Sequence, residues 1–503
     1  MPGRRPLEGG NRLRRTKIVC TLGPASREPR LIRELIAAGM DVARLNLSHS
    51  RRGGFLPLLE AVRAAELEAG RHVAVMLDTR GPEVRTGPVG AGPGGADPGG
   101  AGGRVTLREG ALLTLTPEPV AGDERRLHVT YPRLAEVVAP GTVILLDDGN
   151  VTLEVTRAGG GDVHCRVRRG GTIIGGRKVS LPGIDLDLAP LTVDDVADII
   201  AGARAGADFI ALSFASGAAD VMAARGILNE AGAATGVVAK LESRRGVENL
   251  DDILRASDAV MVARGDLGVE YPVEDVPLIQ KRVIEQCNRA GRPVITATQM
   301  LESMVEHNRP TRAEASDVAN AILDGSDAVM LSEETAIGRY PVEAVQVMAR
   351  IAERAEAALD HEAIMAARAR TARGTVTDAI SYATCAAAAA LGATAIITAT
   401  RSGYTARMVS RFRPVAPIIA ATTDVAVARQ LTLAWGVRPL VAAPAPDTDA
   451  TIEGAVAAAL AAGVVAPGDL VAITAGVPVG VSGTTNLLKV QVVGAGRTGT
   501  AGA

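Results

Sequence analysis

The chain has 503 residues, and its 54 Lys and Arg side chains nearly balance 56 Asp and Glu side chains, for a formal net charge of -2. This balance excludes a protein whose main surface binds nucleic acid or an anionic membrane, because both partners require a basic excess. Hydrophobic residues make up 47% of the chain and charged residues 22%, which excludes wholesale disorder.

Neither the cysteines nor the apolar segments point to an exported protein. The four cysteines, which form no CxxC motif or Cys/His pair, are Cys20, Cys165, Cys287 and Cys385. This spacing argues against a disulfide framework and a zinc site. No signal-peptide segment and no run of about 18 apolar residues occurs, so we expect a soluble, cytoplasmic protein. Residues 1–12 and 495–503 are expected to be disordered tails.

Short β-branched segments that end in polar residues alternate with amphipathic helical stretches. Eight strand-like segments occur, at 16–23, 42–49, 72–79, 209–214, 237–242, 259–266, 293–299 and 328–334. This alternation predicts an α/β fold, a (β/α)8 TIM barrel formed by residues 13–87 and 187–357. Barrel active sites lie at the C-terminal ends of the strands, where the polar residues of these segments stand.

Two further domains are predicted around the barrel pattern. The gap between the third and fourth segments is too long for one helix, and it holds short alternating segments separated by Gly and Asp turns. It predicts a small β-barrel domain at 88–186, inserted as a lid. After the barrel, segments 374–392, 394–400, 415–421 and 470–475 predict a C-terminal α/β domain at 358–494.

Charged side chains mark the ends of the fifth and sixth strands. Lys240 and Glu242 stand two residues apart, so both side chains face the same way. A buried cation beside a carboxylate is typical of a site, because neither charge tolerates burial alone; a surface ion pair is the alternative. Asp266 follows Gly265, and with Glu242 it predicts a shared Mg²⁺ site completed by substrate oxygens. An ordinary helix-capping role is the alternative for Asp266.

Oxygen donors gather on the second and third strands. Arg44, Asn46 and Ser48 alternate on one strand face, and the third strand ends in Asp78-Thr79. Three neutral side chains with one carboxylate form a weak-field oxygen cage that favours a monovalent cation over a transition metal. Each of these residues, taken singly, is equally interpreted as a strand-end hydrogen-bonding group.

Two arginines and a threonine complete the candidate set. Arg44 and Arg85 are candidates for gripping phosphate oxygens, which a guanidinium group does bidentately. Thr298 supplies a hydroxyl at the end of the seventh strand.

Several motifs occur in one order and spacing: TKIVCTLGPAS, GMDVARLNLSH, LDTRGPEVRTG, VVAKLES, MVARGDLGVE, VITATQMLESM, RPTRAEASDVANAILDGSDAVMLSEETAIGRYP and ITAGVPVGVSGTTNLLKV. From about Arg15 to Val492 the chain resembles the pyruvate kinase family. The resemblance implies a barrel, an inserted β-domain and a C-terminal effector domain. It also implies phosphoryl transfer from phosphoenolpyruvate to ADP, giving ATP and pyruvate, as the final step of glycolysis in a homotetramer.

The resemblance further implies a role for each candidate residue. Lys240 stabilises the transferring phosphoryl group, Arg44 contacts the substrate phosphate and Thr298 lies where the enolate is protonated. The substrate-binding set is Arg44, Gly265, Asp266 and Thr298. The metal ligands are Glu242 and Asp266 for Mg²⁺ (or Mn²⁺), and Asn46, Ser48, Asp78 and Thr79 for K⁺. The nucleotide-binding set is Asn46, His49, Arg85 and Arg177.

Two positions refine these expectations. In GGRKVSLPG the family's Lys-Gly-Val-Asn stands as Arg177-Lys178-Val179-Ser180. Arg177 is expected to replace the nucleotide-facing Lys, with Lys178 as the competing candidate. Glu83 in DTRGPE is the residue of the family's potassium-dependent members, so we predict dependence on K⁺.

The segment TRSGYTA (400–406) resembles the family's effector-phosphate loop. The candidate effector residues are Thr400, Ser402, Gly403 and Thr405. Hydroxyls and backbone N–H groups before a helix cradle phosphate, which predicts a sugar phosphate or AMP as effector; an ordinary capped loop is the alternative.

Two competing functions are weighed against phosphoryl transfer. A metal-dependent lyase or aldolase would share the carboxylate pair, but needs neither the insertion nor the cation cage. An inactive metabolite-binding protein would require the loss of Lys240, Glu242, Asp266 or Thr298, and all four are present.

Overall fold

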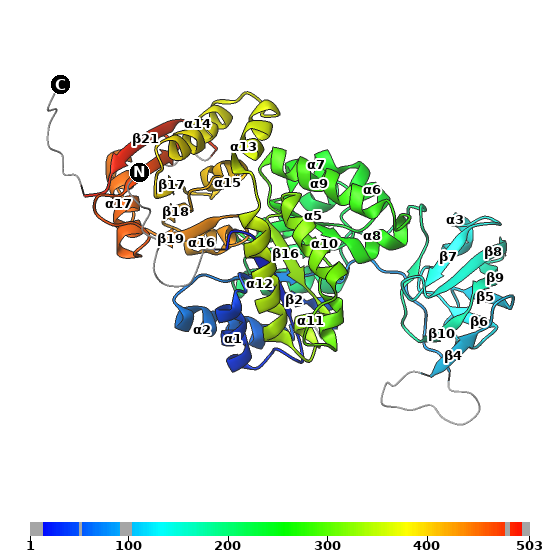
Figure 1. Ribbon diagram of the computed structural model, residues 1–503. Helices are drawn as coiled ribbons and strands as arrows, with labels where there is room; N and C mark the ends of the chain where they lie inside the picture. The colour runs from blue at the N-terminus through cyan, green and yellow to red at the C-terminus, as the bar shows by residue number, and fades with distance from the viewer. Residues whose placement is uncertain (1–13, 50–52, 91–102, 478–482, 495–503) are drawn as a thin grey trace, which may run out of the picture.

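The computed structural model describes residues 14–49, 53–90, 103–477 and 483–494. The predicted tails at 1–12 and 495–503 lie outside these ranges, as does the side chain of His49. Figure 1 shows a central barrel with a sheet unit on one side and an α/β unit on the other.

Eight parallel strands close into a barrel in the order β1-β16-β15-β14-β13-β12-β3-β2. They are β1 (Lys17–Leu22), β2 (Val42–Asn46), β3 (Ala74–Asp78), β12 (Phe209–Leu212), β13 (Gly236–Leu241), β14 (Ala259–Ala263), β15 (Val294–Ala297) and β16 (Ala328–Leu331). Seven of them fall within the predicted segments and β13 begins one residue before its segment, at Gly236, so the barrel prediction is confirmed.

Helices surround the barrel between its strands (Figure 1). The longer ones are α1 (Pro29–Ala38), α2 (Leu56–Ala69), α4 (Val193–Arg204), α5 (Ala218–Glu230), α9 (Val276–Ala290), α10 (Arg312–Leu323) and α12 (Pro341–Ala357). Short ones are η1 (Leu47–His49), α6 (Arg244–Glu248), α7 (Leu250–Ala256), α8 (Arg264–Glu270), η2 (Glu302–Val305) and α11 (Glu333–Ala336). Local sequence sets several boundaries: Thr192 and Asp195 form a capping box that starts α4, and Gly291, at φ 67°, ends α9.

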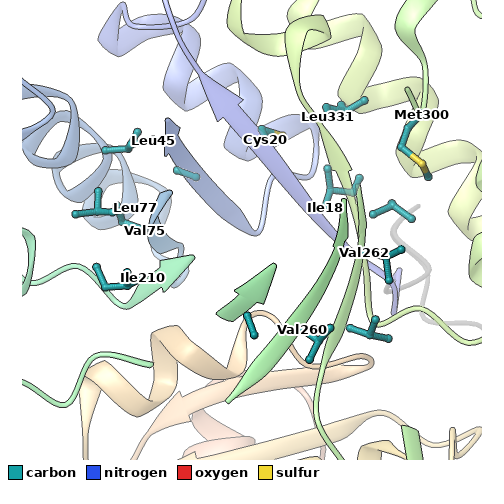
Figure 2. Packing of buried hydrophobic residues seen from close by; sticks show 14 of the residues in the cluster. Ile18, Cys20, Leu45, Val75, Leu77, Ile210, Val260, Val262, Met300 and Leu331 are labelled. Atoms are coloured by element: carbon teal, nitrogen blue, oxygen red, sulfur yellow. The ribbon is translucent and has the colours of Figure 1, made fainter. Parts of the chain in front are cut away.

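The strands build two hydrophobic layers because successive side chains point to opposite faces. Ile18 and Cys20 of β1 pack outward with Val260 and Val262 of β14 among the helices, as Figure 2 shows. Val19 belongs to the inner cluster instead. That cluster fills the barrel with aliphatic side chains and one aromatic ring: Val19, Val42, Ala74, Met76, Phe209, Ala211, Val238, Ala259, Met261, Ile295, Ala297, Ala328, Met330 and Leu433.

The insertion between β3 and α4 forms a separate sheet unit (Figure 1). Six strands pair in the order β11-β7-β8-β9-β5-β6, and β10 pairs with β4. Their bounds, with one short helix, are β4 (Arg104–Leu107), β5 (Leu112–Thr116), β6 (Arg126–His128), α3 (Leu134–Val137), β7 (Val143–Leu146), β8 (Val151–Gly159), β9 (Asp162–Arg169), β10 (Gly171–Ile174) and β11 (Val179–Ser180). The predicted small barrel is thus a six-stranded sheet beside a two-stranded ribbon.

The chain enters and leaves this unit through two neighbouring segments. The N–H of Thr86 donates to the carbonyl of Arg177 at 2.8 Å, and the N–H of Val179 donates to the carbonyl of Val84 at 2.8 Å. The two connections are therefore hydrogen-bonded to each other where they meet the barrel.

The C-terminal unit is a five-stranded sheet in the order β19-β18-β17-β20-β21, with helices against it. Its elements are α13 (His361–Arg370), α14 (Val376–Ala390), β17 (Ala395–Ala399), α15 (Tyr404–Ser410), β18 (Ile418–Thr422), α16 (Val425–Leu431), β19 (Val437–Val441), α17 (Thr448–Ala461), β20 (Leu470–Ala475) and β21 (Leu487–Val492). The predicted α/β domain is confirmed. Within the described ranges, no helix is both long and apolar enough to cross a membrane.

The C-terminal unit packs against the N-terminal end of the barrel. Leu433 joins the inner barrel cluster, and the Nζ of Lys17 donates to the carbonyl of Val437 at 2.7 Å. Arg429 pairs with Glu66 of α2 at 2.9 Å. Burial alone would raise the pKa of the Glu66 carboxyl, but hydrogen bonds from His72 and Arg429 lower that pKa to about 2.

Candidate functional site

The C-terminal ends of β2, β3 and β13 bring three charged side chains together inside the barrel mouth. Asp78 is fully buried, and its Oδ2 accepts from Arg44 Nε at 2.6 Å while its Oδ1 lies 2.9 Å from Lys240 Nζ. Burial opposes ionisation of Asp78, but the charges of Arg44 and Lys240 hold its pKa below the ordinary value. Asp78 therefore fixes both cations at the mouth.

Lys240 and Glu242 share one face, as their spacing predicts. The Nζ of Lys240 lies 2.7 Å from Glu242 Oε1 and donates to Ser213 Oγ at 2.8 Å. The exposed fractions of Lys240 and Glu242 are 7% and 3%, which excludes the surface ion pair. Burial and the nearby charge of Asp266 raise the pKa of Glu242 to about 7, against the opposing effect of Lys240.

A strained backbone presents a donor to Glu242. The N–H of Phe214, just beyond β12, donates to Glu242 Oε2 at 2.7 Å, and Phe214 has a φ of 54°. A non-glycine residue in this left-handed region costs about 1–3 kcal/mol and is often found at active sites. The left-handed backbone of Phe214 and its hydrogen bond to Glu242 therefore make the segment after β12 part of the site.

Asp266 stands in the first turn of α8 and contacts the inserted unit. Its Oδ1 pairs with Lys178 Nζ, which also lies 4.8 Å from the centroid of the Phe214 ring. The charges of Lys178 and Lys240 lower the pKa of Asp266, although burial opposes this shift. The N-cap of α8 is Ala263, so Asp266 is not the capping residue of that helix.

The other residues of the insertion face differently. Arg177 Nε lies 3.2 Å from Asp147 Oδ1 inside the inserted unit, whereas its neighbour Lys178 reaches the barrel mouth. Arg85 pairs with Glu83 and donates to the carbonyl of Gly176 at 2.8 Å. The structure therefore brings Lys178 rather than Arg177 beside Asp266, and the nucleotide roles of Arg85 and Arg177 stay predictions.

Thr298 has a left-handed backbone at the end of β15, with a φ of 68°. Its Oγ1 accepts from the N–H of Gly265 at 2.8 Å and donates to the carbonyl of Ala297 at 2.6 Å. Arg264 Nη2 donates to the carbonyl of Thr298 at 2.6 Å. These bonds hold the seventh strand end against the start of α8, which places Thr298 beside Gly265.

The predicted cation cage lies where β2 and β3 end. Asn46 pairs in register with Asp78, and its Oδ1 accepts from the N–H of Ser48 at 3.1 Å. The carbonyl of Thr79 accepts from Ser213 Oγ at 2.8 Å. In the part of the chain that the structure describes, no group of three or more His, Cys, Asp or Glu side chains is placed to hold a metal ion.

The effector candidates lie in the loop between β17 and α15 and, for Thr405, in the first turn of α15. Gly403 has a φ of 73° at the N-cap of α15, and Thr405 is buried with its hydroxyl 3.0 Å from that of Thr485. Thr400 and Ser402 are partly exposed in the same loop. The loop has the predicted composition, and its effector role stays a prediction.

Ser213 is the central residue that sequence reasoning missed. Its hydroxyl accepts from Lys240 and also lies 3.3 Å from Asp78 Oδ1. The available signal was the alternation of β12, because Ser213, the first residue after that strand, continues the inward parity of Phe209 and Ala211. A polar residue at the inward position of a barrel strand end is a site candidate on that ground alone.

Comparison with known proteins identifies the family. The chain matches the family described as "Pyruvate kinase, barrel domain" over residues 13–345 and that described as "Pyruvate kinase, alpha/beta domain" over residues 378–491. Relatives named pyruvate kinase are 48% identical in Geobacillus stearothermophilus, over 95% of this chain and 80% of the relative, and 46% identical in Sporosarcina psychrophila, over 96% and 81%. A third, from Clostridium acetobutylicum, is 45% identical over 96% of this chain and 100% of the relative. The chain therefore belongs to the pyruvate kinase family of phosphotransferases.

Proposed function

We propose that this chain transfers the phosphoryl group of phosphoenolpyruvate to ADP, giving ATP and, after protonation of the enolate, pyruvate. The observation that carries the proposal is the buried array of Arg44, Asp78, Lys240 and Glu242 at the barrel mouth. Phosphoryl transfer needs positioned charge more than covalent chemistry, and this array positions two cations in a water-poor setting. The reaction would be the last step of glycolysis in the cytoplasm.

Each cation has a distinct part in the proposed reaction. Arg44 binds the substrate phosphate through its guanidinium fork while Asp78 fixes the orientation of that fork. Lys240 stabilises the negative charge of the phosphoryl group in transfer. Its pKa is raised above the ordinary value despite burial, because Asp78 and Glu242 lie beside it. Lys240 therefore stays charged across the physiological pH range.

The carboxylates Glu242 and Asp266 fit a divalent metal. Mg²⁺ is typically held by one or two carboxylates together with substrate oxygens and water, and two carboxylates are what this mouth supplies. Burial, together with the charge of Asp266, raises the pKa of Glu242, and a bound cation would oppose that shift by stabilising the ionised carboxylate. Bound Mg²⁺ or Mn²⁺ would neutralise the charge of the phosphate oxygens during transfer.

The oxygen atoms of Asn46, Ser48, Asp78 and Thr79 fit K⁺, because three of the four side chains are neutral. Glu83 supports the same assignment through the resemblance of DTRGPE to potassium-dependent members of the family.

The remaining residues complete the substrate contacts. Gly265 and Asp266 offer backbone contacts to the substrate, and Thr298 stands beside Gly265 where the enolate would be protonated. The proposed nucleotide contacts are Asn46, His49, Arg85 and Arg177. We further propose that the insertion at 88–186 acts as a lid, that the C-terminal domain at 358–494 takes a sugar phosphate or AMP near Gly403, and that the chain forms a homotetramer.

A coupled assay for ADP-dependent formation of pyruvate from phosphoenolpyruvate tests the proposed reaction. We expect turnover that requires Mg²⁺ or Mn²⁺ and K⁺. Equal turnover in sodium or choline buffer would contradict the potassium site. Release of pyruvate without ADP would instead favour a lyase or aldolase. Titration with phosphoenolpyruvate, with and without sugar phosphates and AMP, tests the effector loop through the half-saturation concentration.

A further inference from the structure

A cavity of about 320 Å³ lies between the barrel and the C-terminal unit. Its walls come from the end of α9, the end of α10, α13 and residues 411–413, which follow α15. Gly325 lines it just before the start of β16, so the cavity stands at the end of the barrel opposite the catalytic mouth. No residue of the loop at 400–406 lines it, so the cavity is also separate from the proposed effector loop.

The cavity wall combines apolar side chains with arginines. Ile322, Leu359, Ile364 and Trp435 contribute apolar surface. Its acidic side chains are already paired with basic neighbours: Glu285 with Arg289 at 2.8 Å, and Asp324 with Lys281.

Two of the three arginines at the inner wall are likewise paired. Arg413 is 2% exposed and lies 3.1 Å from Asp327 Oδ1, and Arg411 pairs with Asp378. These pairs compensate the charges of Arg411 and Arg413. The third arginine, Arg368, is different.

Arg368 of α13 has no carboxylate partner among the described residues. Its Nη1 donates to the carbonyl of Arg411. Its Nη2 lies close to the backbone of Gly325, and a Cβ atom added to that glycine would be 2.9 Å from Nη2. Burial and the charge of Arg413 lower the pKa of its guanidinium well below the ordinary value, and the more distant charge of Asp327 opposes this shift only in part. Arg368 is half-buried, and a cation that is partly removed from water without a paired carboxylate is costly, so an anion in this cavity would be stabilised.

We propose that this cavity binds a small organic anion with an apolar portion, its carboxylate or phosphate on Arg368. The guanidinium offers a planar fork that suits either anion, and the volume lies within the range of about 300–1,000 Å³ typical of small-molecule sites. The apolar part of the ligand lies against Ile322 and Ile364. Because the walls come from both units, the bound anion stabilises their junction and makes the C-terminal unit responsive to a second metabolite.

The chain carries its own reporter for this site. Trp435 is the single tryptophan and lines the cavity, so its fluorescence reports binding without any need for catalytic activity. We would titrate the full chain with phenyl phosphate, with benzoate and with neutral benzyl alcohol. We expect a saturable change with at least one of the two anions and none with the alcohol.

Two variants of neighbouring residues on α13 make the test specific. Arg368→Gln is expected to weaken binding of the anion roughly 10- to 100-fold, the effect of losing a charge-assisted hydrogen bond. Arg370→Gln, on the exposed side of the same helix, keeps the affinity. Because no described carboxylate forms an ion pair with Arg368, Arg368→Gln is expected to keep or raise Tm. Ala367→Phe, which fills the cavity from α13, provides a second loss-of-binding variant.

Each outcome decides the proposal. Saturation by phenyl phosphate alone identifies a phosphate ligand, and saturation by benzoate alone identifies a carboxylate ligand. An absence of saturable change with both anions overturns the proposal. So does an equal response to benzyl alcohol, or unchanged affinity in both Arg368→Gln and Ala367→Phe.

Discussion

Lys240 is the residue whose removal tests the proposed mechanism most directly. Its ammonium lies 2.9 Å from Asp78 Oδ1 and 2.7 Å from Glu242 Oε1, so the four charges of the array sum to zero with Arg44 included. Lys240→Met leaves an excess negative charge in a buried site. Breaking such a pair costs about 3–5 kcal/mol of folding free energy. Protonation of Glu242, whose pKa is already about 7, limits that cost.

The same substitution removes a positive charge from the transferring phosphoryl group. Loss of one electrostatic stabiliser lowers kcat by about 10²–10³-fold, and we expect a fall of that size in pyruvate formation. The matched control is Lys17→Met, a lysine that is similarly buried, at 8% exposure, but stands at the opposite end of the barrel. It is expected to lower stability and keep turnover. A Lys240→Met enzyme that folds and turns over at a near-normal rate would refute the assignment.

Three other predictions concern Glu66, Ser213 and Lys178. The pKa of Glu66 falls from 4.5 to about 2 on folding, so its stabilisation, roughly 3 kcal/mol, is present above about pH 4.5 and lost as pH falls toward 2. Glu66→Gln should flatten the fall in unfolding free energy between neutral and acid pH, and an unchanged slope would contradict the pairing. Ser213→Ala removes one partner of Lys240, so kcat/KM should fall roughly tenfold with little change in Tm. Lys178→Gly frees Asp266, so Mn²⁺ should bind at lower concentration in a direct titration, whereas unchanged binding would show that the ammonium does not compete.

The barrel could be predicted from sequence because burial imposes a strict alternation on its strands. Lys240 and Glu242 were placed on one face by their spacing alone, and the burial of both agrees. The edge strands β19 and β21 were not predicted, because an edge strand is less buried and its sequence need not alternate strictly. β19 contains Pro439 and alternates weakly, which is tolerated only where one side of a strand lacks a partner.

The contacts across the insertion were beyond reach for a different reason. Whether Arg177 or Lys178 faces the mouth depends on how the chain turns between β10 and β11, and neighbouring residues there point to different partners. Phe214 was equally hidden, because only its left-handed backbone turns its N–H toward Glu242. A sequence pattern fixes the parity of a strand, but not the turn that follows it.

The paired connections of the insertion limit how that unit can move. Because Val84 and Thr86 are hydrogen-bonded to Val179 and Arg177, the two connections form one narrow ribbon rather than two independent tethers. Such a ribbon bends across its flat face and resists shearing in its own plane, so a sheet unit that acts as the proposed lid would swing along a single arc. Lys178 sits on this ribbon, so such a swing would carry its ammonium toward or away from Asp266. In the proposed lid, opening of the mouth and exposure of that carboxylate would be mechanically one event.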